Sequence, residues 1–348
     1  MKKAIFFVSN AYNNRKDQYM SCRAEGRILM NIGFGFSLLG YESFIHLPYF
    51  EGIKEVYSNV TLCQTMLDYH YDLAVVWVQP HFLNCKCDRV LFFGYGPDHY
   101  EFAKQNFDKF GKDRMFMVSP FKKNVDYLTQ KSGAQIRYFP PIYPIPSYLP
   151  AESPQGFVPF NYKPALPEIK VYMFSTSWHP PAYPGDVKSQ RFLELLKSKG
   201  YRVKLYLHVN SIENSGVLNA NALKGDETIY LVNSETTYLD LLNVISSVDI
   251  CVTKGGWGSG GNCAWDIISL GKPLLFIAHG KDYVSTINDF YDCPEDLIWC
   301  TESDAVSINK FESFLSNPEA AYNRYKEKLK EHDFPVWKDY VTNFLEGG

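Results

Sequence analysis

One stretch of the sequence decides the fold: DICVTKGGWGSGGNCAWDIISLGKPLLFIA, residues 249–278. Its apolar ends, Asp249 to Thr253 and Leu274 to Ala278, predict two strands, and Asn262 to Leu270 between them predicts a helix. The glycine-rich segment joins the first strand to the helix. Strand, glycine-rich turn, helix and strand in this order form a βαβ unit, so the two strands lie parallel in one sheet.

The same alternation extends in both directions from this stretch. Upstream, strands are predicted at 170–174, 203–209 and 228–232, with helices at 187–199 and 238–247. Downstream, the pattern predicts helices at 303–315, 318–331 and 335–345. The first part of the chain has the same pattern, with strands predicted at 4–9, 43–47, 73–78, 90–93, 115–118 and 136–139, and helices at 25–39, 100–110 and 121–130.

A proline-rich segment separates the two alternating regions. Nine of the chain's 20 prolines lie between Pro140 and Pro167, where neither a helix nor a central strand can persist. We therefore expect an N-terminal domain over 1–145, a linker over 146–168 and a C-terminal domain over 169–348, whose last helix packs back on the N-terminal domain. The expected fold class is α/β, with two Rossmann-like doubly wound domains facing across a cleft that holds the site.

Composition excludes several classes of protein. The 348 residues include 46% hydrophobic and 21% charged side chains, which is a globular composition. With 35 basic and 38 acidic residues the net charge is -3, so no general positive field attracts nucleic acid or an anionic membrane. The N-terminal apolar run is too short for a signal peptide, and no run reaches bilayer length. We expect a cytoplasmic protein, in the host cytoplasm if it is viral.

Cysteine spacing gives no reason to expect a metal site. The eight cysteines are scattered through the chain, as expected of reduced core thiols and not of a disulfide framework. Cys85 and Cys87 form a C-x-C pair, which lacks the spacing and the second ligand pair of a zinc site. We therefore expect neither a metal nor another cofactor.

The glycine-rich turn has the properties of an anion site. Glycine lets backbone N–H groups approach an oxyanion, and the following helix N-terminus adds partial positive charge, so a diphosphate fits there. The residues concerned are Gly256, Gly258, Ser259, Gly260, Gly261 and Asn262. A tight βα turn without a ligand is the structural alternative. A dinucleotide fingerprint, with Asp282 as the ribose acid, is the other, but such a fingerprint belongs to the first βα unit of its domain.

Polar residues follow other predicted strands at the same sheet edges. Ser175, Thr176 and Ser177 follow the first strand of the C-terminal domain, and Lys188 and Arg191 lie near the next helix start, where they suit a diphosphate or form a solvated face. In the N-terminal domain, Asp98 and His99 follow a strand and a Gly-Tyr-Gly-Pro turn, where a catalytic base is expected unless Asp98 is a helix N-cap. Asn13, Arg15, Arg23 and Glu25 suit an acceptor or form an ordinary charged loop.

The glycine-rich turn, the helix acid Asp266 and the Gly271-Lys272-Pro273 entry to a strand together resemble the donor-binding region of GT-B glycosyltransferases. The resemblance implies that Asp266 binds the donor's ribose hydroxyls, although most members carry Glu there. Tyr138-Phe139-Pro140, the helix start at 185–191 and Trp265-Asp266 are similar to bacteriophage DNA glucosyltransferases. That likeness implies that Asp98, more than His99, is the base.

Together these observations predict a glycosyltransferase that moves a sugar from a nucleotide-diphosphate sugar, expected to be UDP-linked, to a hydroxyl acceptor. The acceptor suggested by the phage resemblance is a 5-hydroxymethylpyrimidine in double-stranded DNA; a surface glycan or a small molecule is the alternative. A nucleotide-binding protein without transfer activity and a dinucleotide-dependent oxidoreductase are the competing functions. The sequence does not indicate an oligomeric state.

Overall fold

The computed structural model describes residues 1–7, 24–47, 52–57, 59–77, 84–94, 96–105, 114–142, 159–175, 185–209, 228–232, 238–254, 261–278, 298–300, 309 and 312–347. The chain divides into two compact units. The first comprises Met1–Gly156 together with Glu331–Gly348, and the second comprises Phe157–Lys330. The division therefore falls inside the proline-rich segment, and the end of the chain belongs to the first unit.

The first unit is built on an eight-stranded sheet. Its strands are β1 (Lys2–Phe7), β2 (Tyr41–His46), β3 (Ile53–Tyr57), β4 (Val60–Cys63), β5 (Tyr71–Trp77), β6 (Cys87–Phe93), β7 (Met115–Ser119) and β8 (Ile136–Tyr138). Their order is β3-β4-β2-β1-β5-β6-β7-β8, and every neighbouring pair is parallel except β3 with β4. The sequence analysis did not predict β3 and β4, which form a short antiparallel hairpin at the edge of the sheet.

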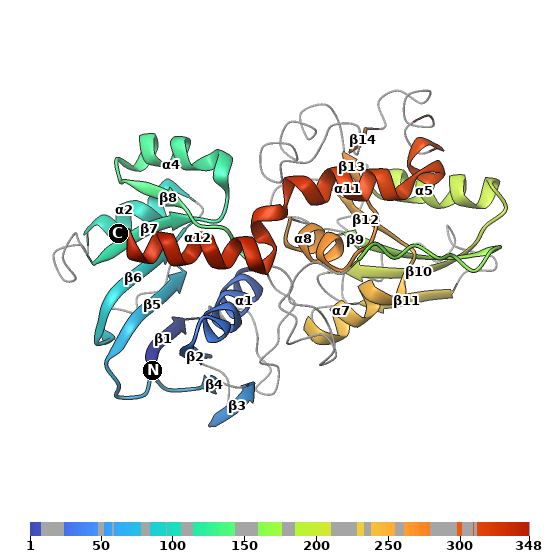
Figure 1. The fold of residues 1–348 in the computed structure, drawn as a ribbon. Coiled ribbons are helices and arrows are strands. Elements are labelled where there is room, and N and C mark those ends of the chain that lie inside the picture. The colour runs from blue at the N-terminus through green and yellow to red at the C-terminus, as the bar shows by residue number, and fades with distance from the viewer. Residues whose placement is uncertain are drawn as a thin grey trace. The chain divides into compact units, whose positions relative to one another are not determined.

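Helices cover both faces of this sheet, as a doubly wound fold requires (Figure 1). They are α1 (Ala24–Leu38), α2 (Pro97–Gln105), the short 3-10 turn Lys122–Asn124 with α4 (Val125–Ser132), and α12 (Phe334–Glu346). Phe36 of α1 contacts Phe6 of β1 and Trp337 of α12, so α1 and α12 share one face. Tyr100 of α2 packs on Phe92 and belongs with Leu128 of α4 to the core of the other face.

The second unit is built on a six-stranded, fully parallel sheet. Its strands are β9 (Glu168–Ser175), β10 (Arg202–Val209), β11 (Thr228–Val232), β12 (Ile250–Lys254), β13 (Leu274–Ala278) and β14 (Ile298–Cys300), in the order β11-β10-β9-β12-β13-β14. Its helices are α5 (Gly185–Ser198), α7 (Tyr238–Ser247), α8 (Gly261–Ser269) and α11 (Pro318–Lys328). Of the strands, only β14 was not predicted.

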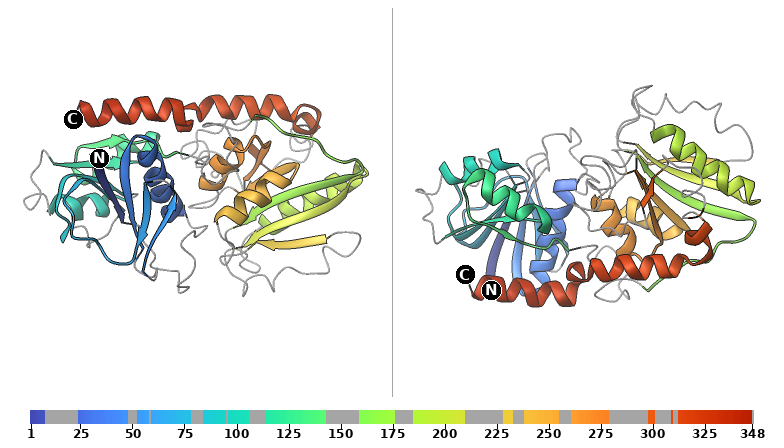
Figure 2. Two further views of the ribbon diagram at one scale, coloured as in Figure 1. Left: turned by 60° about the horizontal axis from the view of Figure 1, so that its bottom comes forward. Right: turned by 90° about the horizontal axis from the view of Figure 1, so that it is seen from above.

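Right-handed crossovers fix which face each of these helices covers. The connection through α5 steps from β9 to β10 in one direction along the sheet, whereas those through α7 and α8 step in the opposite direction. These helices therefore cover opposite faces, α5 on one and α7 with α8 on the other (Figure 2). The predicted α/β fold class with two doubly wound domains is confirmed.

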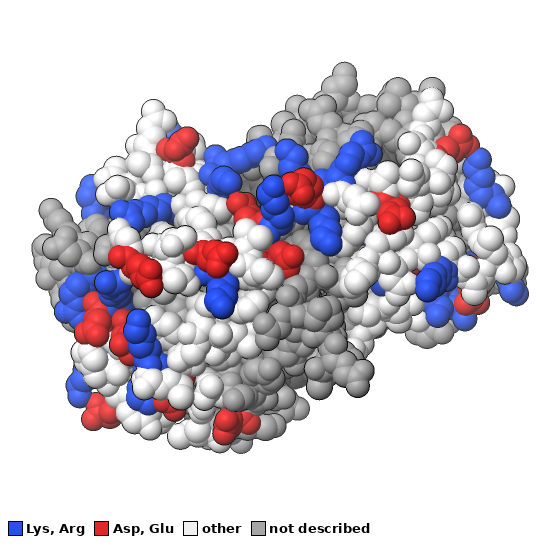
Figure 3. Space-filling model, viewed as in Figure 1, with Lys and Arg blue, Asp and Glu red and all other residues white. Residues whose placement is uncertain are grey.

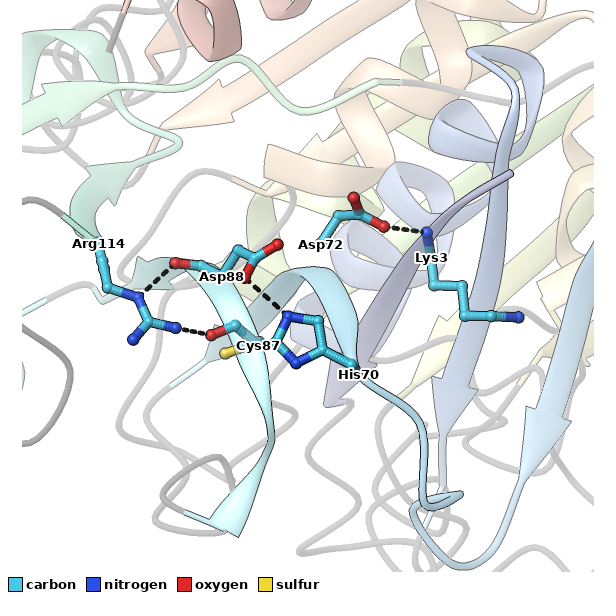
Figure 4. A network of polar contacts seen from close by, with 6 residues as sticks. All are labelled: Lys3, His70, Asp72, Cys87, Asp88 and Arg114. Atoms are coloured by element: carbon cyan, nitrogen blue, oxygen red, sulfur yellow. Dashed lines mark hydrogen bonds and ion pairs between the residues drawn. The ribbon is translucent and has the colours of Figure 1, made fainter.

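In each sheet an aspartate side chain accepts a backbone hydrogen bond at the amino ends of the strands, and the two positions are equivalent. In the first unit, Asp72 Oδ2 accepts a hydrogen bond of 2.7 Å from the backbone N–H of Lys3 (Figure 4). In the second, Asp249 Oδ2 accepts one of 2.8 Å from the backbone N–H of Lys170. Each bond joins the first strand of a unit to the strand that pairs on its other side, β1 to β5 and β9 to β12. The two halves of the chain thus share a detail of side-chain chemistry as well as a topology.

The C-terminal segment is bound to the first unit by polar contacts with residues 138–141. Glu331 accepts hydrogen bonds from Tyr138 Oη at 2.7 Å and from Lys122 Nζ at 3.1 Å. Trp337 Nε1 donates to the carbonyl of Pro140 at 2.7 Å, and Tyr340 Oη donates to the carbonyl of Tyr138 at 2.6 Å. Figure 2 shows α12 running alongside the first sheet. The bonds from Trp337 and Tyr340 satisfy the carbonyls of Pro140 and Tyr138, which lie where prolines prevent regular strand pairing.

A buried histidine completes this group of contacts. His332 is 3% exposed, and its Nδ1 lies 2.7 Å from the carbonyl oxygen of Pro141. A carbonyl oxygen only accepts hydrogen bonds, so Nδ1 of His332 carries a proton and is the donor. In the neutral ring Nε2 is then unprotonated. Burial lowers the pKa of His332, an effect that Lys122 reinforces and that the Pro141 carbonyl and Glu331 oppose.

The lowered pKa of His332 predicts acid sensitivity of the first unit. Above the unfolded-state pKa of about 6.5, the ring is neutral in both states and stability does not depend on it. Below that value His332 is protonated in the unfolded chain but not in the folded chain. The free energy of unfolding therefore falls by about 1.4 kcal/mol per pH unit until the pH reaches the lowered pKa. Urea unfolding between pH 5 and 8 measures this slope.

The matched variants are His332→Gln and His70→Gln. His70 is exposed and pairs with Asp88 at 2.7 Å, so its replacement removes an imidazole from the surface without disturbing the core. His332→Gln should reduce the slope by about one proton, whatever its effect on stability at pH 8. An unchanged slope in His332→Gln would show that other groups cause the acid sensitivity.

Candidate functional site

Each sheet has a point where the strand order reverses, and in open α/β sheets ligands bind there, outside the carboxyl ends of the strands. In the second unit the reversal lies between β9 and β12, and in the first between β1 and β5. These two positions define the candidate sites. The candidate residues were predicted from their positions after strands and not from the strand order, so the order is an independent criterion.

In the second unit three of the donor candidates, Ser175, Gly261 and Asn262, lie on elements that flank the reversal. Phe174 and Thr253 are partners in the pairing of β9 with β12, so the strands end together at Ser175 and Lys254. The glycine-rich turn therefore begins beside the end of β9, and α8 begins at Gly261 and continues through Asn262. The other members of this group, Thr176, Ser177, Gly256, Gly258, Ser259 and Gly260, lie outside the described residues.

Asp266 lies on α8 and is completely buried. Its neighbours Ala264, Trp265, Ile267 and Ile268 are also buried, so this part of α8 has no solvent-facing side. Moving a carboxylate into such a place is costly unless hydrogen-bond donors or cations meet it. α8 has no acidic residue in its first turn, so Asp266 does not act as a first-turn acid that favours the helix dipole.

The remaining candidates are located only by their backbone or lie outside the described part. Lys188 and Arg191 are in the first two turns of α5, which follows β9 at the reversal. Glu25 is the second residue of α1, which follows β1 at the corresponding place in the first unit. Asn13, Arg15 and Arg23 lie outside the described residues.

The candidate base lies one strand away from the reversal in the first unit. β6 pairs with β5 and ends at Phe93, and α2 begins at Pro97, a favoured first residue for a helix. Asp98 is therefore inside the first turn of α2 and is not its N-cap. A Cβ added at Gly96 would collide with Asp98 Oδ1, so the carboxylate lies over the turn and would have to shift if residue 96 carried a side chain.

Asp98 and His99 are adjacent in space but differ in exposure. The Asp98 side chain is 79% exposed and the His99 side chain 26%, and the distance from His99 Nε2 to Asp98 Oδ2 is 3.8 Å. This separation permits an ionic contact but is longer than a hydrogen bond. The structure therefore gives an accessible carboxylate with an imidazole behind it, at the carboxyl edge of the sheet.

Tyr100, which the sequence analysis did not select, holds this turn in place. Its side chain is fully buried, and its hydroxyl donates toward the carbonyls of Gly94 at 2.7 Å and Val118 at 2.9 Å. Burial raises the pKa of Tyr100, so the hydroxyl remains a neutral donor. The ring occupies the place of a side chain at Gly94, whose added Cβ would be 3.1 Å from Tyr100 Cζ. One buried phenol thus ties the ends of β6 and β7 to the turn that carries Asp98.

The described residues also bear on metal binding and on membrane insertion. No group of three or more His, Cys, Asp or Glu side chains within them could hold a metal ion. None of the helices in this part of the chain combines the length and apolar character needed to cross a membrane.

Comparison with known proteins gives likeness in structure alone. No protein-family model matches the sequence, and neither does any curated protein. Among solved structures, the chain is similar to sucrose-phosphate synthase from Thermosynechococcus elongatus, with a TM-score of 0.57, 12% identity and 99% of both chains covered. It is also similar to WaaG, a glycosyltransferase involved in lipopolysaccharide biosynthesis, with a TM-score of 0.55, 13% identity and 99% and 100% of the two chains covered.

A third similar structure is the catalytic domain of starch synthase IV from Arabidopsis thaliana, bound to ADP and acarbose. Its TM-score is 0.56 at 10% identity, covering 99% of this chain and 98% of that one. These likenesses extend over both units of the chain. The class that they and the strand order define is the GT-B fold, with two Rossmann-like domains.

Proposed function

We propose that the protein is a glycosyltransferase, which moves a sugar from a nucleoside-diphosphate sugar to a hydroxyl group of an acceptor. The observation that carries this proposal is the likeness to sugar-transferring synthases and to a glycosyltransferase over 99% of this chain. The reversal of strand order beside the glycine-rich turn supports it, because a phosphate ligand binds at such a point. A dinucleotide enzyme is not favoured, since the first βα unit of the second unit is β9 with α5 and not the glycine-rich turn.

The donor would bind to the second unit. Backbone N–H groups of the turn at Gly256, Gly258, Ser259, Gly260 and Gly261, together with Asn262, would surround the diphosphate. Lys188 and Arg191 at the start of α5, with Ser175, Thr176 and Ser177 after β9, would add positive charge and hydroxyl groups. Asp266 is buried in this structure, so it would accept hydrogen bonds from the ribose after the groups that cover it move aside. This arrangement supplies the charge that a diphosphate leaving group needs from the chain itself, so we propose no metal.

Asp98 would be the general base on the first unit. Its carboxylate would take the proton of the acceptor hydroxyl as the hydroxyl oxygen bonds to C1 of the sugar and the bond from C1 to the diphosphate oxygen breaks. The nucleoside diphosphate then leaves with the electron pair of that bond. The 79% exposure of Asp98 supports this assignment, because an acceptor can reach the carboxylate.

Replacing Asp266 by Ala should weaken donor binding by roughly 10- to 100-fold. The reason is that a hydrogen bond to a charged group contributes about 1.5 to 3 kcal/mol, and about 1.4 kcal/mol corresponds to a factor of ten. Calorimetric titration with the nucleotide sugar measures the effect. Ser269→Ala is the matched control, because Ser269 is equally buried on the same helix and its hydroxyl bonds only to the carbonyls of Trp265 and Asp266.

A thermal melt of each variant separates binding from folding. Asp266→Asn keeps the shape of the side chain and should fold even if Asp266→Ala does not. Donor affinity equal to that of the unaltered protein in a folded Asp266 variant would remove this residue from the site.

A donor panel tests the function itself. We would incubate the protein with UDP-, ADP-, GDP- and TDP-linked sugars and measure release of the free nucleoside diphosphate. We expect release from one nucleotide class, and we propose UDP; the ADP bound to the Arabidopsis enzyme is the reason for including ADP-sugars. Tight binding without release, with or without acceptors, would indicate a nucleotide-sugar-binding protein without transfer activity.

The acceptor that we propose is a 5-hydroxymethylpyrimidine in duplex DNA. An enzyme that modifies such a base must flip it from the stack and hold the flanking phosphates with basic residues. On the face drawn in Figure 3, basic and acidic side chains are intermixed among the described residues. Lys122, a basic residue of the first unit that we propose for such a phosphate contact, lies 3.1 Å from Glu331 and over the ring of Tyr138. This environment favours a small number of local phosphate contacts over broad electrostatic attraction.

Incubation with hydroxymethylcytosine DNA and the donor panel, then digestion to nucleosides and mass spectrometry, tests the acceptor. A nucleoside with the added mass of a sugar supports DNA. Donor turnover that depends on a glycan or small molecule, with no such nucleoside, would remove the DNA acceptor and leave the glycosyltransferase proposal in place.

A further inference from the structure

His46 is a titratable residue at the carboxyl edge of the first sheet to which the proposed reaction assigns no role. It is the last residue of β2, and β2 pairs with β1, one of the two strands at the reversal. Its side chain is partly exposed, whereas its neighbours Phe44, Ile45 and Leu47 are buried. His46 was not predicted from the sequence, because a histidine at a strand end is not distinctive until the strand order is known.

Strand pairing fixes the position of His46 from both sides. Its backbone lies opposite Phe7 of β1 and Cys63 of β4, and the pairing with β4 continues through a hydrogen bond of 2.9 Å from the Leu47 N–H to the Cys63 carbonyl. The imidazole packs on the ring of Phe7, with 5.4 Å between the ring centres. An inner strand holds a side chain more precisely than a loop does, so His46 is positioned before any ligand binds.

His46 lies on the same face of the sheet as the helix that carries the candidate base. Paired residues of neighbouring strands point to one face, so the imidazole shares a face with Phe7. Phe7 belongs to the core cluster that also contains Tyr100 of α2. Asp98 lies in the first turn of α2, which follows the carboxyl end of β6. The two polar residues therefore share both a face and an edge of the first sheet.

The distance between these residues sets a minimum size for a molecule that contacts both. The strands β2, β1, β5 and β6 are consecutive neighbours in the sheet (Figure 1). Neighbouring strands are about 4.8 Å apart, so three spacings place His46 roughly 14 Å from the end of β6. Stacked nucleotides rise about 3.4 Å per step along one strand, so this distance corresponds to roughly four nucleotides. A nucleoside at Asp98 would not reach His46, whereas a chain of nucleotides would.

We propose that His46 donates a hydrogen bond to a phosphate of the acceptor strand, several nucleotides from the base that is modified. The assignment depends on the proposed transfer to DNA, and it adds the requirement that the acceptor is a chain and not a free nucleoside. An imidazole has an N–H donor whether it is neutral or protonated, and phosphate oxygens are the most frequent acceptors in protein–DNA contacts. A single directed contact of this kind suits a chain with a net charge of -3, which has no general positive field.

Steady-state kinetics with two acceptors test the contact. They are 5-hydroxymethyldeoxycytidine and a duplex oligonucleotide that carries the same base at its centre, each with a saturating nucleotide sugar from the donor panel. His46→Ala should raise the KM for the oligonucleotide by roughly 10- to 100-fold, the usual effect of losing one hydrogen bond to a charged group. The KM for the nucleoside should not rise, and kcat should not fall in proportion, because His46 is distant from the reacting hydroxyl. His46→Gln keeps an N–H donor, so its KM for the oligonucleotide should rise by less than about 10-fold.

His70→Ala is the matched control. His70 is an exposed histidine of the same unit that precedes β5, at the opposite end of the strands, so both KM values should stay as in the unaltered protein. Partial unfolding of a variant lowers kcat through the amount of active protein, but it does not raise the KM for one acceptor alone.

The outcomes separate this contact from the proposed function. If the unaltered protein transfers sugar to DNA and His46→Ala has the same KM for the oligonucleotide, the contact is overturned and the proposed function stands. Transfer to a glycan and not to DNA would overturn the phosphate contact and leave a glycosyltransferase. Absence of transfer to every acceptor by the unaltered protein would contradict the proposed function, and the contact with it.

Discussion

Asp98→Asn should lower the rate of sugar transfer by roughly 10²- to 10⁴-fold, which is the usual contribution of a positioned general base. Donor affinity should not change, because Asp98 belongs to the first unit and the proposed donor contacts belong to the second. The amide has nearly the same shape as the carboxylate and still fits over Gly96. The measurements are turnover at saturating donor and a calorimetric titration with the donor alone.

Glu101→Gln is the control for this variant. Glu101 is an exposed carboxylate on the same helix, three residues further on, and its replacement removes the same charge from α2. Turnover by Glu101→Gln should stay near normal. If Asp98→Asn also turned over at a near-normal rate, Asp98 would not be the base, and His99 beside it would be the better candidate.

Periodicity in the sequence was sufficient to predict most of the fold. Buried parallel strands are nearly continuous apolar runs, so β5 with its Leu-Ala-Val-Val core and β13 with Leu-Leu-Phe-Ile were predicted within a few residues. The hairpin of β3 and β4 was missed because it lies at the sheet edge: Ile53 is 60% exposed and Glu55 faces solvent. β14 was missed because three residues are too short for a periodic pattern.

The site was predictable in part, for a different reason. A turn composed of glycines can be recognised in the sequence, and so can an acidic residue just after a predicted strand. The strand order could not be predicted from the sequence. It places β9 beside β12 and so brings the end of β9 at Ser175 beside the end of β12 at Lys254. Nor could the sequence distinguish Tyr100 from Phe102 on the same helix, because the role of Tyr100 depends on the carbonyls of Gly94 after β6 and Val118 in β7.

Trp337 contributes both packing and a hydrogen bond where the chain returns to the first unit. It is fully buried on α12, and its ring lies 6.0 Å from that of Phe36 and 6.5 Å from that of Phe139. Contact with α1 is close, because a Cβ added at Gly35 would be only 2.8 Å from Trp337 Cη2. Its indole N–H also satisfies the carbonyl of Pro140. Packing and hydrogen bonding therefore act through one side chain.

Trp337→Ala should destabilise the first unit by about 3 to 5 kcal/mol, the usual cost of removing a buried Trp or Phe side chain. At about 1.4 kcal/mol per factor of ten, amide exchange through unfolding of this unit should accelerate by roughly 10²- to 10³-fold or more. Native-state hydrogen exchange measures it, with Val336→Ala as control because Val336 is 44% exposed on the same helix. Trp337→Phe keeps an aromatic ring but orphans the Pro140 carbonyl, so a smaller loss of about 1 to 3 kcal/mol is expected. Exchange in β8 and α1 that is as slow in Trp337→Ala as in the control would mean that α12 lies on the first unit without stabilising it.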